Sequence, residues 1–240
     1  MSLGGPEQDV SGARPASRPA PRRADAGTPG GFPAPAPEDP IPFRFEPGGF
    51  LLVLSGPSGA GKGTLVERLV AARPECVFSI SATTRPKRPN EADGVQYEFV
   101  TPAEFERQRS AGLFLEWAEV HEHLYATPAR FVDEQVRAGR VVVLDVDVQG
   151  GASVRRARRD AVSVFIYPPS IDALRQRLLK RNTDAASVVE TRLRNAPGEL
   201  AEWREYDYLV MNDDLEQAVA RLTAIVDAEC ARVRRLHPRS

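Results

Sequence analysis

The segment Gly56-Pro-Ser-Gly-Ala-Gly-Lys62-Gly-Thr64 decides how this chain folds. It follows the apolar run Phe50-Leu-Leu-Val-Leu-Ser55, which is typical of a strand buried on both faces. A helical pattern follows it over residues 64–72, and the order strand, glycine loop, helix predicts a phosphate-binding loop. We therefore expect a nucleoside triphosphate such as ATP to bind Gly56, Pro57, Ser58, Gly59, Ala60, Gly61, Lys62, Gly63 and Thr64.

One position of the loop departs from the general pattern G-x-x-x-x-G-K-[ST], in which the last hydroxyl binds magnesium directly. Here that position is Gly63, and the hydroxyl comes one residue later, at Thr64. The sequence Gly-Lys-Gly-Thr resembles the loop of nucleoside monophosphate kinases. We expect Mg²⁺ to arrive with ATP and to rest mainly on phosphates and water, with no direct metal ligand from the protein.

Composition limits the classes of protein that the chain can belong to. Its 240 residues form one large domain or a domain with an appendage, and 42% apolar residues are enough for a core. A net charge of −1 argues against nucleic-acid or anionic-membrane partners. Cys76 and Cys230 lack metal-ligand spacing and are expected to be reduced residues of a cytoplasmic protein. No apolar run reaches the roughly 18 residues of a membrane span, and no secretion signal is visible.

Residues 1–47 differ from the rest of the chain. They hold eleven of the 21 prolines and few large apolar residues, so they are expected to form a disordered, Pro-rich tail. A transit peptide is the alternative, because arginines are present. However, the segment is too acidic for that, since it contains Glu7, Asp9, Asp25, Glu38 and Asp39.

Strand and helix patterns alternate from residue 50 onward. Short Val- and Ile-rich runs at 77–81, 141–146, 162–167 and 208–211 alternate with helical patterns that include 171–181 and 215–235. This alternation predicts an α/β fold, a three-layer parallel sheet core. The mixed stretch 82–128, strand-like at 97–100 and helical at 102–111, is expected to be an inserted subdomain. Pro197-Gly198 is expected to kink or break the surrounding helix.

A second anion site follows the strand at 77–81. Arg85 and Arg88 lie among hydroxyl residues, and guanidinium groups bind phosphate oxygens two at a time. Tyr97 and Tyr125 can add hydroxyl donors, although a solvated basic loop is the alternative. Asp145 and Asp147 alternate along a strand, so their side chains share one face near the strand end. The run Arg155-Arg-Ala-Arg-Arg159 is expected to be a solvated helix face.

These motifs together resemble the guanylate kinase family over residues 49–230. The resemblance rests on the loop and on Ser81-Ala-Thr-Thr-Arg85-Pro-x-Arg88-Pro, Gly94-x-x-Tyr97-x-Phe, Phe114-Leu-Glu116-Trp-Ala, Tyr125-Ala-Thr127, Leu144-Asp145-Val-Asp147-Val-Gln-Gly150, Pro168-Pro-Ser170 and Asn212-Asp-Asp-Leu215. It implies transfer of the terminal phosphoryl group of ATP to GMP and to dGMP, giving ADP and GDP. The implied partners are these small molecules. No nucleic acid or membrane partner is expected, and the oligomeric state is left open.

The resemblance also implies a role for each matching residue. The GMP phosphate is assigned to Arg85, Arg88, Tyr97 and Tyr125, and guanine to Ser81, Glu116, Thr127 and Asp147, with Asp145 nearby. The implied catalytic cations are Lys62, Arg177, Arg181 and Arg192. The implied layout is a kinase domain over 48–235, with its core at 48–81 and 128–235, a GMP-binding insert at 82–127 and a lid at about 181–195. Asn182 stands where the family lid usually has glycine, so lid motion is open to change.

Two alternatives compete with an active guanylate kinase. Some scaffold proteins contain guanylate-kinase-like domains that bind protein partners and have lost catalysis, but their loops are typically degraded, whereas Lys62 and the loop glycines are present here. A kinase for another monophosphate, such as AMP, is the second alternative. Glu116 and Asp147 argue against it, because carboxylates accept the hydrogen bonds that a guanine edge donates.

Overall fold

Strand β2 (Phe50–Ser55) lies in the middle of the central sheet, and all six of its residues are buried. The computed structural model describes residues 1, 44–89, 91–120, 122–181 and 186–239. The sheet has the order β10-β9-β2-β8-β3, with β10 at Tyr208–Met211, β9 at Val162–Tyr167, β8 at Val141–Asp145 and β3 at Cys76–Phe78. Every pairing in it is parallel. The predicted α/β class is therefore confirmed.

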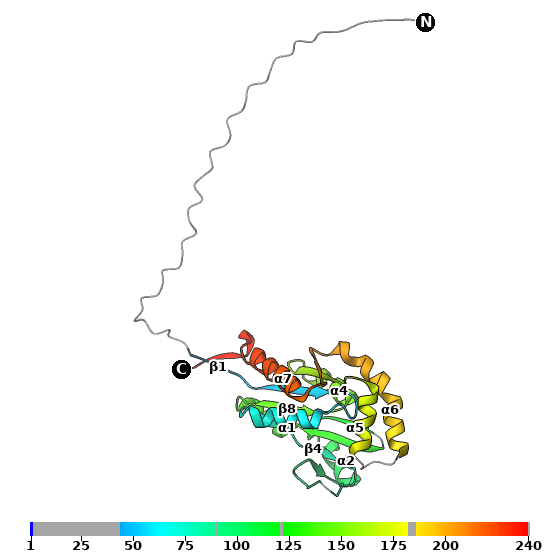
Figure 1. The fold of residues 1–240 in the computed structure, drawn as a ribbon. Helices are drawn as coiled ribbons and strands as arrows, with labels where there is room; N and C mark the ends of the chain where they lie inside the picture. The colour runs from blue at the N-terminus through cyan, green and yellow to red at the C-terminus, as the bar shows by residue number, and fades with distance from the viewer. Residues whose placement is uncertain (2–43, 90, 121, 182–185, 240) are drawn as a thin grey trace, which may run out of the picture. The chain divides into compact units, whose positions relative to one another are not determined.

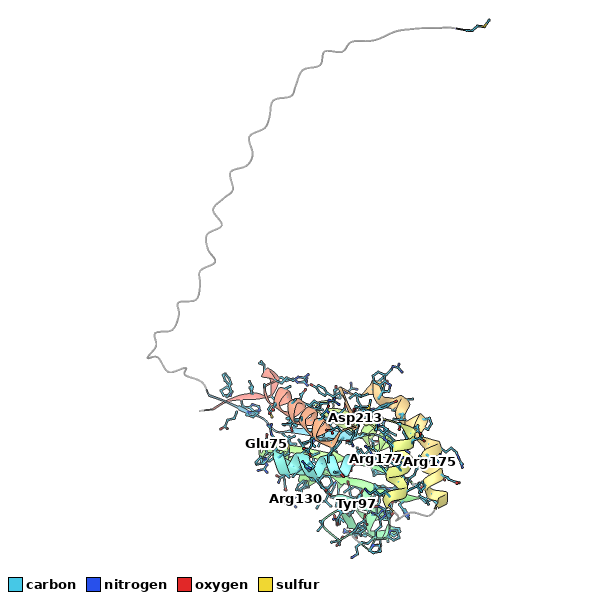
Figure 2. All side chains as sticks on the ribbon, viewed as in Figure 1. Glu75, Tyr97, Arg130, Arg175, Arg177 and Asp213 are labelled. Atoms are coloured by element: carbon cyan, nitrogen blue, oxygen red, sulfur yellow. The ribbon has the colours of Figure 1, made fainter. Side chains whose placement is uncertain are left out.

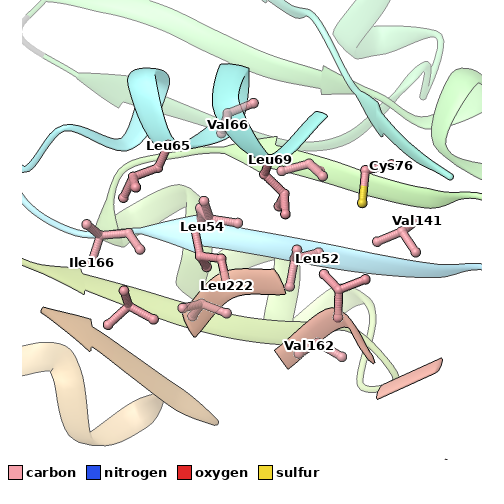
Figure 3. Close-up of a cluster of buried hydrophobic side chains, with 14 of the residues drawn as sticks. Leu52, Leu54, Leu65, Val66, Leu69, Cys76, Val141, Val162, Ile166 and Leu222 are labelled. Atoms are coloured by element: carbon pink, nitrogen blue, oxygen red, sulfur yellow. The ribbon is translucent and has the colours of Figure 1, made fainter. Parts of the chain in front are cut away.

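Helices cover both faces of this sheet because successive side chains of each strand point to opposite sides. Leu52 and Leu54 face α1 (Lys62–Ala72) and α7 (Leu215–Cys230), which contribute Leu65, Leu69 and Leu222 (Figure 3). Leu51 and Val53 face the opposite layer, where α3 (Ala129–Arg137) contributes Val132 and α4 (Val148–Ala157) contributes Val154. This arrangement is the predicted three-layer core.

A second sheet forms the insert. Its order is β5-β4-β7-β6, with β5 at Tyr97–Phe99, β4 at Ser81–Thr83, β7 at His123–Pro128 and β6 at Phe114–Val120, and α2 (Pro102–Ser110) belongs to the same region (Figure 1). The predicted strand at 77–81 is in fact divided. The Ser79 N–H still bonds the Val143 carbonyl of the core sheet at 3.0 Å, and the chain then joins the second sheet at Ser81. The sheet therefore begins one residue before the predicted insert.

Helices α5 (Ile171–Arg181) and α6 (Ala186–Ala201) pack against each other. The predicted break at Pro197 is wrong, since α6 continues through it to Ala201. Two contacts with Ser58 hold the helix on either side of the proline. Arg192 Nη1 donates to Ser58 Oγ at 3.1 Å, and the Glu199 carboxylate accepts the Ser58 N–H. The predicted lid at 181–195 includes residues 182–185, so Asn182 lies outside the described residues.

The two ends of the described domain pair with each other. Strand β1 (Arg44–Pro47) runs antiparallel to β11 (Leu236–Arg239), so 44–47 belong to the folded domain and not to the predicted tail. Helix α7 ends at Cys230 and not at 235, because the chain turns back and Arg235 bonds the buried carboxylate of Glu229 at 3.2 Å. The rest of the predicted tail, residues 2–43, lies outside the described residues. No helix in the described part of the chain is long and apolar enough to span a membrane.

Candidate active site

The loop between β2 and α1 has a backbone conformation that requires glycine. Gly61 caps α1 in the left-handed region at φ 92°, and a Cβ there would collide with Nδ2 of Asn212. Gly56 has φ 140°, and a Cβ there would collide with the carbonyl oxygen of Ile166. The loop therefore lies directly against the ends of β9 and β10. The amino end of α1 points from it into the space beyond the carboxyl ends of the strands.

Side chains fasten the loop from its outer side. Asn212, which is buried just after β10, donates from Nδ2 to the Ala60 carbonyl at 2.7 Å. Arg177 of α5 donates to the Ala60 carbonyl at 3.1 Å and to the Asn212 carbonyl at 2.8 Å. Figure 2 shows Arg177 on α5. These bonds fix the loop before any ligand binds, which lowers the entropic cost of arranging its N–H groups.

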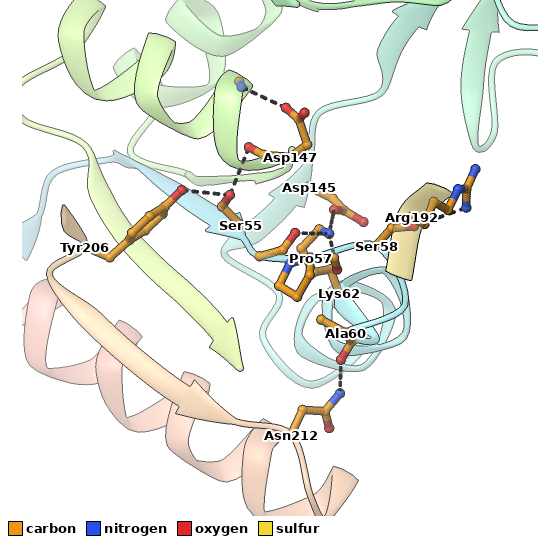
Figure 4. Close-up of polar contacts among 12 residues, drawn as sticks. Ser55, Pro57, Ser58, Ala60, Lys62, Asp145, Asp147, Arg192, Tyr206 and Asn212 are labelled. Carbon is orange, nitrogen blue, oxygen red and sulfur yellow. Dashed lines mark hydrogen bonds and ion pairs between the residues drawn. The ribbon is translucent and has the colours of Figure 1, made fainter. Parts of the chain in front are cut away.

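Lys62, the first residue of α1, lies at the inner side of the loop. Its Nζ donates to the Gly56 carbonyl at 2.9 Å and lies 3.8 Å from the Asp145 carboxylate at the end of β8 (Figure 4). The side chain is mostly buried, with 12% of it exposed. Asp145 thus holds the ammonium group next to the loop while leaving it within reach of an anion.

One cavity of about 270 Å³ joins the loop to the second sheet. Its walls include most of the residues that the sequence nominated: Ser58, Gly59, Gly61, Lys62, Gly63, Ser81, Arg85, Arg88, Tyr97, Glu116, Tyr125, Asp145, Asp147 and Arg192. The lining includes cations beside the loop, Lys62 and Arg192, and others beside the second sheet, Arg85 and Arg88, and it also includes the carboxylates of Glu116, Asp145 and Asp147. The structure thus brings the two predicted anion sites into a single space.

Glu116 is a buried acid in the wall of this cavity. It is 8% exposed on β6, and its Oε1 accepts the Thr127 hydroxyl proton at 2.7 Å. Burial, with a smaller contribution from nearby Asp147, raises the pKa of Glu116 to about 7 against the opposing hydrogen bond from Thr127. Thr127 is completely buried behind Glu116, so it orients the carboxylate and contributes no wall of the cavity.

The basic end of the second sheet is organised by a carboxylate. Arg85 donates to Glu91 at 2.7 Å, and Arg88 lies 3.7 Å from the same Glu91. Arg85 also hydrogen-bonds Tyr125 and stacks on the Tyr97 ring at 5.4 Å. Burial raises the pKa of the Tyr97 phenol, so its hydroxyl stays a proton donor at neutral pH. The four residues expected to hold a monophosphate therefore form one cluster.

A second cavity, of about 370 Å³, opens on the other side of the loop. Its lining includes Thr64, Arg177, Lys180, Asn212 and Asp213. Two predicted residues, Thr64 and Arg177, thus line this second cavity. They do not line the first cavity, between the loop and the second sheet, which is called the main cavity below. Gly59 and Gly61 line both cavities, so the loop separates them. The side chain of Arg181, at the end of α5, lies outside the described residues.

Comparison with known proteins now identifies the family. The guanylate kinase family profile matches residues 49–229. This chain belongs to the guanylate kinase family. A guanylate kinase from Symbiobacterium thermophilum is 51% identical over 187 residues, which cover 78% of this chain and 89% of the relative. One from Thermotoga maritima is 46% identical over 187 residues, covering 78% and 90%.

A solved structure agrees with this assignment. The guanylate kinase of Anaplasma phagocytophilum superposes with a TM-score of 0.68 at 34% identity, and the match covers 80% of this chain and 92% of that one. Guanylate kinases are nucleoside monophosphate kinases that phosphorylate GMP with ATP. The expected fold and enzyme class are therefore confirmed.

Several residues at the guanylate kinase site were not nominated from the sequence. Glu91 organises the arginines, and Glu199 lies against the loop near Lys62 and Arg192. Burial raises the pKa of Glu199, and Asp147 adds to the rise, whereas Lys62, the Ser58 N–H and Arg192 oppose it. The sequence around Glu199 contains no motif that indicates a site. Glu199 reaches the loop only because α6 continues through Pro197.

The residues present fit a magnesium ion that is held by substrate phosphates and water. No group of three or more acidic, histidine or cysteine side chains in the described ranges could hold a metal by itself. Gly63 occupies the usual hydroxyl position, and a Cβ there would lie 3.7 Å from Asp145 Oδ2, so space exists beside one carboxylate. Thr64 is exposed and faces the second cavity.

Proposed function

We propose that this chain transfers the terminal phosphoryl group of ATP to GMP inside the main cavity. The observation that carries the proposal is that a single cavity is lined both by the loop with Lys62 and by Glu116 and Arg85 of the region of the second sheet. Phosphoryl transfer needs two nucleotides held in line with their charge neutralised, and it needs little covalent chemistry from the protein. A cavity with a phosphate site at each end supplies that geometry.

ATP is proposed to lie across the loop, with its phosphates in the main cavity and its nucleoside end in the second cavity. The backbone N–H groups of 56–61 and the amino end of α1 face the phosphates. Arg177 supports this placement, because it fixes the loop carbonyls and lines the second cavity. Mg²⁺ carried by ATP would supply charge neutralisation at the phosphates, with Asp145 the nearest carboxylate beside Gly63.

GMP is proposed to bind with its phosphate on the basic cluster of Arg85, Arg88, Tyr97 and Tyr125. Glu116, when ionised, has only acceptor sites, and guanine presents N1–H and an N2 amino group side by side. The Thr127 hydroxyl uses Oε1 of that carboxylate, which fixes its plane. Asp147 and Ser81, both in the wall of the cavity, complete the base site. dGMP keeps the same base and phosphate and is proposed as a second acceptor.

The transferring phosphoryl group is proposed to meet Lys62 and Arg192. Lys62 lies at the inner side of the loop, and Arg192 reaches the loop from α6 through Ser58. Preorganised cations stabilise charge that develops in the transition state, because they need no rearrangement during the reaction. Arg181 is proposed to join them when α5 and α6 close over the site, which also excludes water.

The biological setting is proposed to be guanine nucleotide synthesis and recycling in the cytoplasm, with small molecules as partners. Free Cys76 and Cys230 support a reducing compartment. The loop also argues against a non-catalytic binding module, because its glycines and Lys62 keep the geometry that phosphates need.

A coupled ADP-release assay with GMP, dGMP and AMP tests this proposal. We expect GMP and dGMP to support turnover, and AMP to be at least a hundredfold poorer in kcat/KM, because a site built for specific hydrogen bonds strongly rejects an analogue that lacks them. Equal turnover with AMP would contradict the base assignment. Absence of turnover with every acceptor, while GMP still binds in calorimetry, would favour the binding module.

A further inference from the structure

A chain of two partly buried hydrogen bonds reaches the proposed guanine side of the site from Tyr206, which lines neither cavity. Ser55, the last residue of β2, is completely buried. Its Oγ donates to the Asp147 carbonyl at 2.9 Å, and the Tyr206 hydroxyl donates to Ser55 Oγ at 2.8 Å (Figure 4). Tyr206 thus connects to the backbone of Asp147 through one serine hydroxyl.

Asp147 is fixed at both its backbone and its side chain. It is the N-cap of α4, where its Oδ1 accepts the Gly150 N–H at 2.8 Å, and its carbonyl also accepts the Gly151 N–H at 2.8 Å. Ser55 adds a third bond that ties this carbonyl to β2, the strand that leads into the loop. The Asp147 side chain lines the main cavity, so a small shift of its backbone would move a proposed guanine ligand.

The tyrosine ring contacts Phe165 and Arg155. Phe165 packs edge-on with ring centroids 5.0 Å apart, and the Arg155 guanidinium lies 4.1 Å from the ring centroid. Arg155 is half-buried and packs on this ring. The prediction that the run 155–159 is a solvated helix face is therefore wrong for Arg155. These two contacts favour the position from which the Tyr206 hydroxyl reaches Ser55.

Gly151 shows that the space for the two hydroxyls is specifically kept. It lies within α4, where glycine costs about 1 kcal/mol relative to alanine. A Cβ at this position would lie 2.6 Å from the Tyr206 hydroxyl and 3.0 Å from Ser55 Oγ. A side chain here would therefore push the hydroxyl pair apart. The helix therefore has a residue of low helix propensity at a position that faces this pair.

We propose that the Tyr206–Ser55 hydroxyl pair is a positioning device for Asp147, so that Tyr206 sets the affinity for the guanine nucleotide without touching it. The proposal rests on the proposed function of the main cavity. Tyr206 also directly follows the turn Glu202–Glu205 at the end of α6, the helix that carries Arg192 and Glu199 to the loop. The same pair of hydroxyls therefore connects the end of α6 to the proposed guanine site.

Tyr206→Phe tests this proposal, with Tyr208→Phe as a matched control. Both changes delete one phenol hydroxyl that donates at 2.8 Å, but Tyr208 bonds Glu229 at the end of α7, away from both cavities. We expect Tyr206→Phe to raise KM for GMP three- to tenfold while KM for ATP stays within twofold. Tyr208→Phe should lower the melting temperature and leave both KM values within twofold.

A double-mutant cycle with Asp147→Ala shows whether Tyr206 acts through Asp147. On the Asp147→Ala background, Tyr206→Phe should change KM for GMP less than twofold. If Tyr206→Phe folds poorly, Ser55→Ala replaces it, and this variant must also raise KM for GMP while KM for ATP stays within twofold. The proposal is overturned if KM rises equally for GMP and ATP, if neither variant changes KM for GMP, or if the effect is undiminished without Asp147. Failure of the wild type to phosphorylate GMP would instead overturn the proposed function.

Discussion

The two ends of the main cavity are built in opposite ways. The loop end is one continuous segment, residues 56–64, whose conformation depends on glycines such as Gly56 and Gly61 and whose backbone N–H groups are proposed to bind phosphate. The guanine end is assembled from side chains of β4, β6, β7 and the start of α4. Backbone N–H groups bind any phosphate, whereas placed carboxylates and hydroxyls distinguish one base from another. Under the proposed function, phosphate binding comes from contiguous main chain, and selectivity for the base comes from dispersed side chains.

The largest expected effect lies at the loop end, where Lys62 is the charged side chain. Lys62→Ala should lower kcat at least about a hundredfold, because removing a preorganised charge from a transition state commonly costs a few kcal/mol. The ADP-release assay measures the rate, and a thermal melt verifies folding. Lys87→Ala is the matched control, since Lys87 is exposed and outside both cavities, and it should stay within twofold of wild type. Near-normal turnover of folded Lys62→Ala would contradict the loop assignment.

At the opposite end, Arg85→Ala should separate the two substrates. A hydrogen bond to a charged group is worth about 1.5–3 kcal/mol, so KM for GMP should rise at least tenfold while KM for ATP changes less than twofold. Arg107→Ala is the control within the insert, because Arg107 pairs with Glu104 on exposed α2. Steady-state titration of each substrate measures the split. An equal rise in KM for GMP and KM for ATP would instead place Arg85 where the phosphoryl group passes between the two nucleotides.

The pKa of Glu116 predicts a pH dependence that only the guanine end should show. The ionised carboxylate is the acceptor, and its pKa is about 7 in the free protein. KM for GMP should therefore fall as pH rises from 6 to 8, by several-fold, while KM for ATP stays flat. Glu116→Gln should remove this dependence, because the amide does not titrate. A profile unchanged by the substitution would assign the ionisation to another group.

The same group makes a prediction about stability with the opposite sign. A carboxyl whose pKa rises on folding favours the folded state when protonated, so its contribution declines as pH increases from about 4.5 through 7. The full shift corresponds to roughly 3 kcal/mol at most, which is several degrees of melting temperature for a domain of this size. Glu116→Gln should thus melt above wild type at pH 8 and close to it at pH 5. If the melting temperatures of the variant and wild type differed by the same amount at pH 5 and pH 8, the claim that ionised Glu116 destabilises the fold would be contradicted.

The smallest expected effect concerns the paired ends of the domain, far from either half of the cavity. A chain beginning at Phe43 should keep full activity and melting temperature, whereas one beginning at Gly48 lacks β1 and loses its pairing with β11. We expect the second chain to melt about 2–4 °C lower, with turnover unchanged. A drop in turnover on removing 1–42 would show that the Pro-rich segment contributes to the site.

The comparison of the two ends also explains what the sequence could predict. The loop was predictable because strand, loop and helix are consecutive, and the alternation of apolar runs was enough for the parallel core. The break that was one of the two outcomes predicted at Pro197 does not occur, and local propensity cannot include the two contacts that Ser58 makes on either side of it. Glu199 and Tyr206 gave no local signal, since only the fold brings α6 and the turn after it to the loop and to Ser55. Strand β1 was missed because its partner is nearly two hundred residues away.

The most direct test of the account compares GMP and IMP, with AMP as the lower reference, in wild type and in Glu116→Gln. IMP keeps N1–H and lacks the N2 amino group, so wild-type kcat/KM should fall in the order GMP, IMP, AMP. Glu116→Gln should lower kcat/KM for GMP by at least tenfold and leave kcat/KM for AMP nearly unchanged. The ratio of kcat/KM for GMP to that for AMP should therefore decrease. A wild type that uses AMP as well as GMP, or a variant that keeps the full preference, would contradict the claim that this buried carboxylate reads guanine.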